Sequence, residues 1–273
     1  MSRVGQDPWY SADQMNPAVT SQPPGTMGLP SGAPANVPWM PKPNVVGCPA
    51  GLEYLADLDK ILVQKQIDLT ELLTMYDAEN RYRLFNPAGQ QVYFASEESN
   101  SCERQCCHGN RSFTMHITDN TGMEVIRLQR EFQCWKASCW CACSDCCAHT
   151  LSIEAPVGTT VGYVRQKCSV CQPIYAVQDY DHNELMTILG PCCVTGCSDI
   201  EFRVTSATDD QDIGEITKKV YLPMVDALTS ADKFGVSFPR SLDIKQKATM
   251  IGACFLIDFM FFERPQVRRR RRY

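Results

Sequence analysis

The chain has 273 residues, of which 44% are hydrophobic and 21% are charged, and its formal net charge is −5. This composition is that of a globular protein, and it excludes collagen-like, coiled-coil and multi-spanning membrane proteins. Residues 1–267 hold 21 basic and 31 acidic side chains, a net of −10, whereas residues 268–272 are all arginine, so the chain is not a general nucleic-acid binder with basic residues across a face.

The first segment, residues 1–46, is rich in Pro, Gly, Ser, Ala and Asn and shows little apolar periodicity. It cannot bury enough surface to offset the entropy of ordering, so we predict a disordered Pro-rich arm. Residues 38–41 (PWMP) form a minimal PxxP motif for an SH3 or WW domain, although a plain linker is the favoured interpretation. No apolar signal segment opens the chain, so we expect a cytosolic location where thiols stay reduced.

The ordered region is predicted to be one domain over residues 47–264. Leu52, Leu55 and Leu58 indicate a short helical turn. Beyond it, strand-forming stretches lie on both sides of turn sequences, which is the pattern of a β-hairpin. Five such pairs occur: 81–85 with 91–95, 112–117 with 123–129, 151–155 with 161–166, 174–178 with 185–189, and 201–205 with 213–220. Ten strands without a βαβ rhythm favour a sandwich or a closed barrel.

Six cysteines lie within the 14 residues of the segment 134–147 (CWKASCWCACSDCC). Crowded thiols beside Trp135 and Trp140 in a cytosolic chain are typical of S-palmitoylation. Two or more acyl chains give stable membrane anchoring, whereas one gives weak and reversible attachment. We predict acylation here; a cysteine-rich loop packed as small hydrophobic residues and a metal site are the alternatives.

Two further cysteine groups flank this cluster. Cys102, Cys106 and Cys107 lie beside His108. Cys168, Cys171, Cys192 and Cys197 form two short pairs separated by 20 residues, a spacing similar to that of a zinc ribbon. The adjacency of Cys192 and Cys193 and the longer second spacer depart from that pattern. Reduced, buried cysteines are therefore favoured over zinc.

The most apolar stretch is residues 248–262 (ATMIGACFLIDFMFF), and we predict a helix over about 247–263. Its length of about 22 Å is short of the roughly 30 Å hydrocarbon core of a bilayer. Asp258 within it would cost about 2.5–3.5 kcal/mol at the bilayer centre. A helix that is apolar all round can instead fill a protein core, so we favour a helix buried in the lumen of a barrel over a membrane span.

The basic tail, residues 265–273, ends in Arg268, Arg269, Arg270, Arg271, Arg272 and a final tyrosine. Near an anionic leaflet each arginine contributes about 1 kcal/mol before screening. We interpret the run as a contact for anionic lipid; a solvated tail and a nuclear import signal are the alternatives.

Several segments are similar to those of the phospholipid scramblase family: GLEYL at 51–55, GQQVYFA at 89–95, the cysteine cluster, GYV at 162–164, GPC at 190–192 and residues 234–263. The resemblance covers about residues 45–264. It implies a tubby-like closed antiparallel barrel of about twelve strands around a buried C-terminal helix. It also implies calcium-stimulated, ATP-independent movement of phospholipids between membrane leaflets.

The resemblance further implies palmitoylation of Cys139, Cys141, Cys143, Cys146 and Cys147, and a calcium site in the loop Ser230 through Ser241. Asp232 is the one carboxylate within that loop, and Asp243 lies just beyond it. Calcium takes six to eight oxygen ligands, so we expect millimolar or weaker affinity. Apolar residues alternate at Phe234, Val236 and Phe238, which favours a structural strand leading into the helix.

We therefore predict a calcium-responsive lipid scramblase, acylated and attached to the cytoplasmic face of the plasma membrane, with phospholipids as its partners. A membrane-anchored signalling adaptor without transport activity is the alternative, and a nuclear location without acylation is the minor one. Because the chain supplies no second hydrophobic segment for a lipid path, transport would require a homo-oligomer or a local distortion of the bilayer. No nucleophile elbow, P-loop or dinucleotide fingerprint indicates an enzyme.

Overall fold

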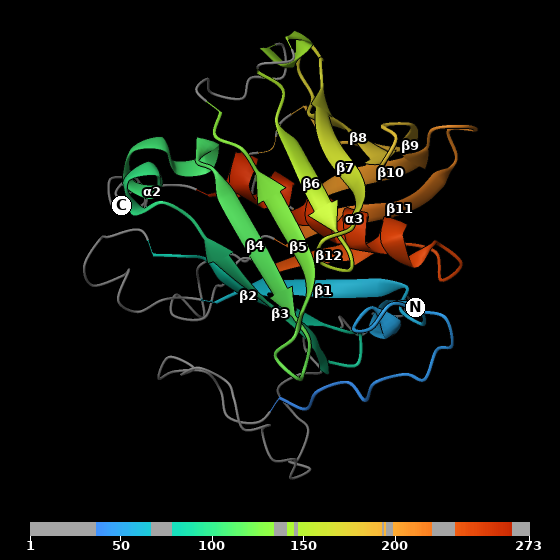
Figure 1. Ribbon diagram of the computed structural model, residues 1–273. Coiled ribbons are helices and arrows are strands. Elements are labelled where there is room, and N and C mark those ends of the chain that lie inside the picture. Colours follow the sequence, from blue (N-terminus) through green and yellow to red (C-terminus); the bar gives the residue numbers. More distant parts are fainter. Residues whose placement is uncertain are drawn as a thin grey trace, which may run out of the picture.

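The computed structural model describes residues 37–66, 78–133, 141–144, 147–192, 194, 199–219 and 233–263. This part of the chain is mainly β, and its twelve strands close into one antiparallel barrel with a C-terminal helix packed against it (Figure 1). The strands are β1 (Lys60–Lys65), β2 (Arg81–Phe85), β3 (Gln91–Glu98), β4 (Phe113–Thr118), β5 (Glu124–Arg130), β6 (Thr150–Glu154), β7 (Thr160–Lys167), β8 (Ile174–Asp179), β9 (Glu184–Leu189), β10 (Ile200–Ser206), β11 (Asp212–Lys219) and β12 (Lys233–Ser237). The helical elements are η2 (Glu53–Leu55), α2 (Ser101–Cys107), η3 (His108–Asn110), η4 (Cys141–Cys143), α3 (Ile244–Ile257) and η5 (Asp258–Phe262). The predicted fold class is confirmed.

All five predicted hairpins are present, as the antiparallel pairs β2–β3, β4–β5, β6–β7, β8–β9 and β10–β11. Their turns use the expected chemistry. Gly89 and Gly122 have φ of 78° and 80°, a left-handed conformation that glycine adopts without strain. Each donates its backbone N–H to the carbonyl of the residue three positions earlier, Asn86 or Asp119. Local turn sequences therefore determine these pairings.

The barrel is closed by β1 and β12, two strands that lie far apart in the sequence. Val63 pairs with Phe234 and Ile61 with Val236 in an antiparallel register. No turn sequence links residues 60–65 to a neighbouring strand-forming stretch, and the sequence pattern did not identify them as a strand. Phe234, Val236 and Phe238 are buried, which confirms the strand interpretation of this part of the loop before the helix.

The last ten residues of the predicted arm are part of the described structure. Trp39 forms a parallel bridge with Gln91 in β3. The Gln91 N–H donates to the carbonyl of Pro38 at 2.9 Å, and the Met40 N–H donates to the carbonyl of Gln91 at 2.8 Å. The end of the predicted arm therefore meets a barrel strand at residues 38–40, a contact that the sequence pattern did not anticipate. Residues 1–36 lie outside the described residues.

Helix α3 begins at Ile244, three residues before the predicted start at 247, and passes into the π-helical turn η5, which ends at Phe262. The start is set by Asp243, whose carboxylate accepts a hydrogen bond from the backbone N–H of Lys245 at 2.9 Å. Such an N-cap satisfies a backbone donor that has no partner within the helix. Sequence reasoning considered Asp243 as a calcium ligand and therefore did not use it to place the helix start.

The helix is buried over its whole surface from Lys247 to Ile257, as expected for an apolar helix inside a core. Phe255 meets the Tyr82 ring edge to face at 4.9 Å, and Phe259 stacks on Phe113 at 4.0 Å. The Tyr82 hydroxyl donates to the Asp258 carboxylate at 2.7 Å. The predicted lumen location is confirmed, and so is a hydrogen-bonded Asp258.

Lys247 fixes the first turn of α3 to the start of the barrel. Its ammonium group is buried, and the three N–H donors are shared among four backbone carbonyls, those of Leu55, Ala56, Leu58 and Arg240, at 2.9–3.2 Å. Burial lowers the pKa of Lys247, and nearby aspartates oppose that shift. The carbonyl oxygens replace the water that the ammonium group loses on burial.

Antiparallel strands joined in sequence place alternate connections at opposite ends of the barrel. We call one the hairpin end: it holds the five tight turns and the start of α3. We call the other the cysteine end, which holds the described residues of the connections between β3 and β4, β5 and β6, β7 and β8, and β9 and β10, namely 99–112, 131–133, 141–144, 147–149, 168–173, 190–192, 194 and 199. Because α3 runs from the hairpin end to the cysteine end, the described chain ends at the cysteine end at Glu263.

Candidate functional site

The cysteine end collects thiols from four separate connections of the barrel. Cys102, Cys106, Cys171 and Cys192 are exposed, and Cys107 and Cys147 are half-buried. They are separated by up to 90 residues in the sequence and meet here because every second connection of the barrel lies at this end. The site proposed from the cysteine cluster is therefore part of a larger group of thiols.

The predicted acylation sites are placed in part. Cys139 and Cys146 lie outside the described residues, whereas Cys141 and Cys143 form the turn η4. Cys143 is joined to Cys168 in a disulfide, with Cα atoms 4.6 Å apart. A disulfide sulfur cannot carry a thioester, so acylation of Cys143 would require this bond to be reduced first, and acylation of the cluster stays a prediction.

The pairing follows from the register of β6 and β7. The Gln166 N–H donates to the carbonyl of His149 at 2.8 Å, so the chain before β6 and the chain after β7 leave the sheet side by side. This arrangement brings the η4 turn to Cys168. The spacing of the cysteines in the sequence does not reveal this strand register.

The predicted zinc set is not assembled as proposed. Cys168 is in the disulfide, and Cys197 lies outside the described residues. The Cys171 and Cys192 sulfurs lie 3.5 Å apart, and this contact raises the pKa of the Cys192 thiol. Within the described ranges, no three His, Cys, Asp or Glu side chains are grouped so as to hold a metal ion. The structure thus brings Cys171 and Cys192 together, and zinc at the four cysteines stays an untested alternative.

The structure describes only one of the two predicted calcium ligands. Asp232 lies outside the described residues, and Asp243 is the N-cap of α3 at the hairpin end. The intervening residues form β12, which is hydrogen-bonded on both sides to β1 and β11. The described part of the loop is thus strand and helix cap, and calcium binding remains a prediction.

A groove with a volume of about 860 Å³ lies on the outer face of β4 to β7 and reaches residues of the cysteine end. The register aligns one polar residue from each strand in a cross-strand row, namely Thr114, Gln129, Ser152 and Tyr163. Their strand neighbours Phe113, Leu128, Leu151 and Val164 are buried, so the polar row faces outward by strand alternation. Sequence reasoning missed this row, although its residues occupy outward-facing positions in the alternating pattern of the predicted hairpins.

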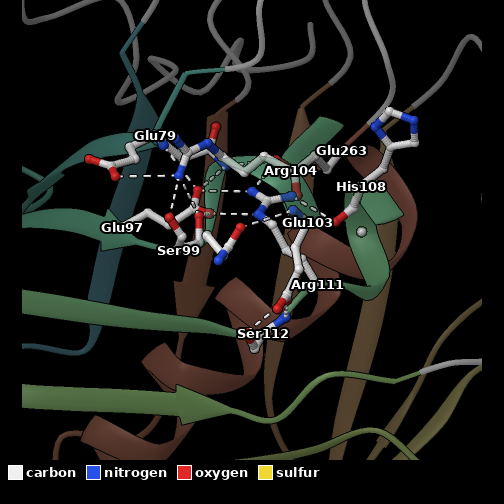
Figure 2. A network of polar contacts seen from close by, with 12 residues as sticks. Glu79, Glu97, Ser99, Glu103, Arg104, His108, Arg111, Ser112 and Glu263 are labelled. Carbon is white, nitrogen blue, oxygen red and sulfur yellow. Dashed lines mark hydrogen bonds and ion pairs between the residues drawn. The ribbon is translucent and has the colours of Figure 1, made fainter. Parts of the chain in front are cut away.

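Inside the barrel at the cysteine end, Arg111 joins two carboxylates that lie far apart in the sequence. Figure 2 shows its guanidinium between Glu97 of β3 and Glu263, the last described residue. Arg111 donates to both oxygens of Glu97 at 2.6 and 2.9 Å and to both oxygens of Glu263 at 2.6 and 2.8 Å. The Asn80 amide donates to both carboxylates at 2.7 Å. This buried network fastens the end of the central helix to the barrel wall.

Within this network, the ion pairs outweigh burial in setting the pKa values of Arg111 and Glu263. Burial alone would lower the pKa of Arg111, but Glu263 and Glu97 outweigh burial and raise it. Burial alone would raise the pKa of Glu263, but Arg111 and Lys65 outweigh burial, so this pKa lies below its ordinary value. Paired charges of this kind are costly to break, since one partner is then left buried and uncompensated.

The short helix α2 is held firmly although its cysteines are exposed. Asn100 caps it by accepting from the N–H of Cys102 at 2.8 Å. Arg104 donates to the carbonyl and hydroxyl of Ser99 and to Glu79, as drawn in Figure 2. Glu103 accepts from the backbone N–H and the hydroxyl of Ser112, both at 2.8 Å. The exposed thiols of Cys102 and Cys106 are thus carried by a fixed element.

Three buried polar side chains lie beside this network: Arg130 of β5, His149 just before β6, and Gln166 of β7. Arg130 donates through Nη2 to the carbonyls of Gly109 and Arg111. Five other nitrogens have no hydrogen-bond partner in the protein: Nε and Nη1 of Arg130, both ring nitrogens of His149 and the amide nitrogen of the Gln166 side chain. Burial and the nearby Arg111 lower the pKa of Arg130 to about 9. Burial and Arg130 lower the pKa of His149 to about 3, so this imidazole is neutral at physiological pH.

The arginine run Arg268 to Arg272 lies outside the described residues. In the part of the chain that is described, none of the helices has the length and apolar character required to span a bilayer.

Comparison with known proteins identifies the family. A family model described as Scramblase matches residues 40–264. The chain is 44% identical to phospholipid scramblase 2 of Homo sapiens, over 89% of this chain and 82% of that protein. It is 46% identical to phospholipid scramblase 1 of Mus musculus, over 85% and 70% of the two chains, and 42% identical to phospholipid scramblase family member 5 of Homo sapiens, over 85% and 87%. The chain therefore belongs to the phospholipid scramblase family.

Proposed function

We propose that the protein moves phospholipids in both directions between membrane leaflets without ATP, as a lipid transporter and not as an enzyme. The observation that carries this proposal is family membership, since relatives that are 42–46% identical over most of their length are named phospholipid scramblases. Acyl chains on the cysteine cluster would attach the barrel to the cytoplasmic face of the plasma membrane.

The outer groove offers a route for lipid headgroups. A headgroup that leaves water loses hydrogen bonds unless the surface along its path replaces them. The row of Thr114, Gln129, Ser152 and Tyr163 supplies hydroxyl and amide groups from four adjacent strands, and the groove continues to the cysteine end. A polar surface beside an acylated anchor supports transport along the protein.

Calcium is the cofactor that we propose, with Asp232 and Asp243 as its ligands. Because the Asp243 carboxylate already accepts a hydrogen bond from the Lys245 N–H, calcium must share this oxygen set with the helix cap. This competition supports an affinity in the millimolar range or weaker. We propose no role for zinc, since Cys168 is held in a disulfide.

A lipid-flip assay with the full acylated chain in liposomes tests transport. Replacing Gln129 with Leu removes the central polar group of the groove, and we expect the flip rate to fall about tenfold, equivalent to about 1.4 kcal/mol in the barrier. Glu201→Leu, which introduces the same apolar side chain at an exposed position of β10 outside the groove, is the control and should leave the rate unchanged.

The same assay tests calcium with variants that keep the helix cap. Asp232→Asn and Asp243→Ser remove both carboxylates, while serine still caps the helix. Loss of the calcium stimulation in this double variant supports the site, and an unchanged stimulation argues against it. If the bound protein produces no lipid flip above that of protein-free liposomes, the alternative function, a membrane-anchored adaptor, is supported instead.

An SH3 or WW domain that binds the arm would then have to displace the backbone pairing of Pro38 and Met40 with Gln91.

Acylation is tested by replacing Cys139, Cys141, Cys146 and Cys147 together with Ala. We expect the protein to move from the membrane fraction of cells to the soluble fraction, because stable anchoring takes at least two attachments. Cys48→Ala, a half-buried cysteine outside the cysteine end, is the matched control and should stay with the membrane. Full membrane retention of the fourfold variant would overturn the acyl anchor and leave the tail as the main attachment.

A further inference from the structure

We infer that the barrel lumen at the cysteine end binds a small inorganic anion of the chloride class between Arg130, His149 and Gln166. The site does not depend on lipid transport, since it lies on the inner side of the wall formed by β5, β6 and β7 and uses none of the outward-facing polar row of the groove. Three features of these side chains carry the inference: their burial, their adjacency across the strands, and their excess of hydrogen-bond donors.

All three side chains are buried in the barrel. Arg130 is 3% exposed, Gln166 is 1% exposed and His149 has no exposed area. The guanidinium of Arg130 lies over the ring of Phe113 at 4.7 Å and near the ring of Phe259 in η5 at 5.6 Å. A ligand that these polar groups share is therefore enclosed by protein on the side of the central helix.

The strand register places the three side chains on one patch of the inner wall. The Gln166 N–H donates to the carbonyl of His149 at 2.8 Å, so these two residues are direct cross-strand neighbours. Arg130 pairs with Leu151, which lies two positions after His149 and has the same inward phase. Diagonal neighbours of this kind are about 7–8 Å apart, a distance that a long side chain spans. After burial, the charge of Arg130 is the second cause of the lowered pKa of His149, in agreement with this proximity.

The patch has more hydrogen-bond donors than acceptors. In the described protein, Nε and Nη1 of Arg130, the side-chain amide nitrogen of Gln166 and both ring nitrogens of His149 have no partner. These atoms supply three N–H bonds from the arginine, two from the amide and one from a neutral imidazole, against a single imidazole lone pair. The Gln166 amide oxygen already accepts from the His149 backbone N–H at 3.4 Å. A ligand that satisfies this set must mainly accept hydrogen bonds, as an anion does.

The charge of Arg130 favours an anion over a neutral acceptor. Its Nη2 group donates to the backbone carbonyls of Gly109 and Arg111, and it forms no ion pair with a residue that the structure describes. Burial and Arg111 lower its pKa to about 9, although the carboxylates of Glu97 and Glu263 oppose that shift. Arg111 contacts all four oxygens of these carboxylates. A buried cation without a direct counter-ion is costly, and an anion in contact with it offsets that cost.

The surroundings select a small ion with a single charge. The apolar side chains of Phe113, Leu151 and Phe259 border the patch, so the ion must lose most of its water there. Removing water from one charge costs less than removing it from the two charges of sulfate. Arg130 and Ala148, the residue before His149, also line the outer groove, so the path from solvent to the site crosses one layer of the barrel wall.

Thermal unfolding of the full chain in sodium chloride and in sodium gluconate at equal ionic strength tests the site, because gluconate is too large to enter it. We expect chloride to raise the midpoint in a saturable way, by about 3–6 °C when chloride is about tenfold above its dissociation constant. Gln166→Met keeps a side chain of similar length without the amide and should abolish this difference between the two salts. Gln178→Met, at a half-buried position of β8 that pairs with Tyr163, is the matched control and should retain it.

Crystals grown with bromide locate the ion, since bromide replaces chloride and scatters X-rays anomalously. A bromide peak within hydrogen-bond distance of Arg130 and Gln166, together with the chloride effect on the wild type, supports the site even if Gln166→Met does not fold. Water alone at this position, or equal stability of the wild type in chloride and gluconate, would overturn it. A chloride effect that persists in Gln166→Met would belong to exposed charges elsewhere and would also overturn the site.

Discussion

Replacing Arg111 with Met will lower the free energy of unfolding by about 3–5 kcal/mol, the usual cost of breaking a buried ion pair from one side. The reason is that Arg111 contacts all four carboxylate oxygens of Glu97, which is buried, and Glu263, which is mostly buried. Without it, two like charges face each other out of water. Urea unfolding followed by circular dichroism measures the loss.

The pH dependence distinguishes electrostatics from lost packing. In the wild type the depressed pKa of Glu263 contributes stability that is present above the unfolded pKa and is lost as pH falls through the folded one. In the variant the buried carboxylates favour protonation, so the difference between the two proteins should be largest at pH 7 and shrink toward pH 4. A difference that stays constant over this range would assign the effect to packing.

An exposed ion pair is the control for this experiment. Arg203 contacts Asp212 at 2.6 Å, but the two side chains are 64% and 61% exposed. Such pairs contribute about 0–1 kcal/mol because water screens them and replaces the contact. Arg203→Met should therefore change the stability little. A loss for Arg111→Met that is no larger than this would mean that the network does not hold the helix end.

The hairpins were predictable because each is encoded locally. Alternating apolar residues define the two strands, and turn residues such as the glycines at 89 and 122 join them within four or five positions. The closing strands β1 and β12 were not paired by sequence reasoning, because residues 60–65 and 233–237 meet only once ten other strands are in place. The barrel as a whole was expected from family resemblance, and the local pattern alone left a sandwich open.

The candidate site was predicted less completely, and for physical reasons. Cysteine clustering indicated the region but not the pairing of Cys143 with Cys168, which depends on how β6 and β7 align. Glu97 has the inward phase of Tyr93 and Ala95 in β3, which indicates a buried carboxylate. Its partner Arg111 and the second carboxylate Glu263 could not be inferred, because they meet only through the barrel and its helix.

Replacing Phe255 with Ala will lower the free energy of unfolding by about 3–5 kcal/mol, since it leaves a cavity along the centre of the barrel. The Phe255 ring is fully buried and meets the Tyr82 ring edge to face at 4.9 Å. The helix is surrounded by strands, and Gly252 lies so close to Ile153 that an added Cβ would come within 2.9 Å of it. Neighbouring side chains therefore have little freedom to fill the space, and thermal or urea unfolding should show the full loss.

A matched apolar truncation at the surface provides the control. Val170 is 93% exposed, so Val170→Ala removes no buried contact and should change the stability by no more than about 0.5 kcal/mol. Phe255→Asp places an unpaired carboxylate in the same apolar lumen and should leave no folded domain. If Phe255→Ala and Phe255→Asp both stayed as stable as the wild type, the helix would not be the core of the barrel. The hydrogen bonds of Lys247 at one end of the helix and of Glu263 at the other would then not fix a core element in the barrel.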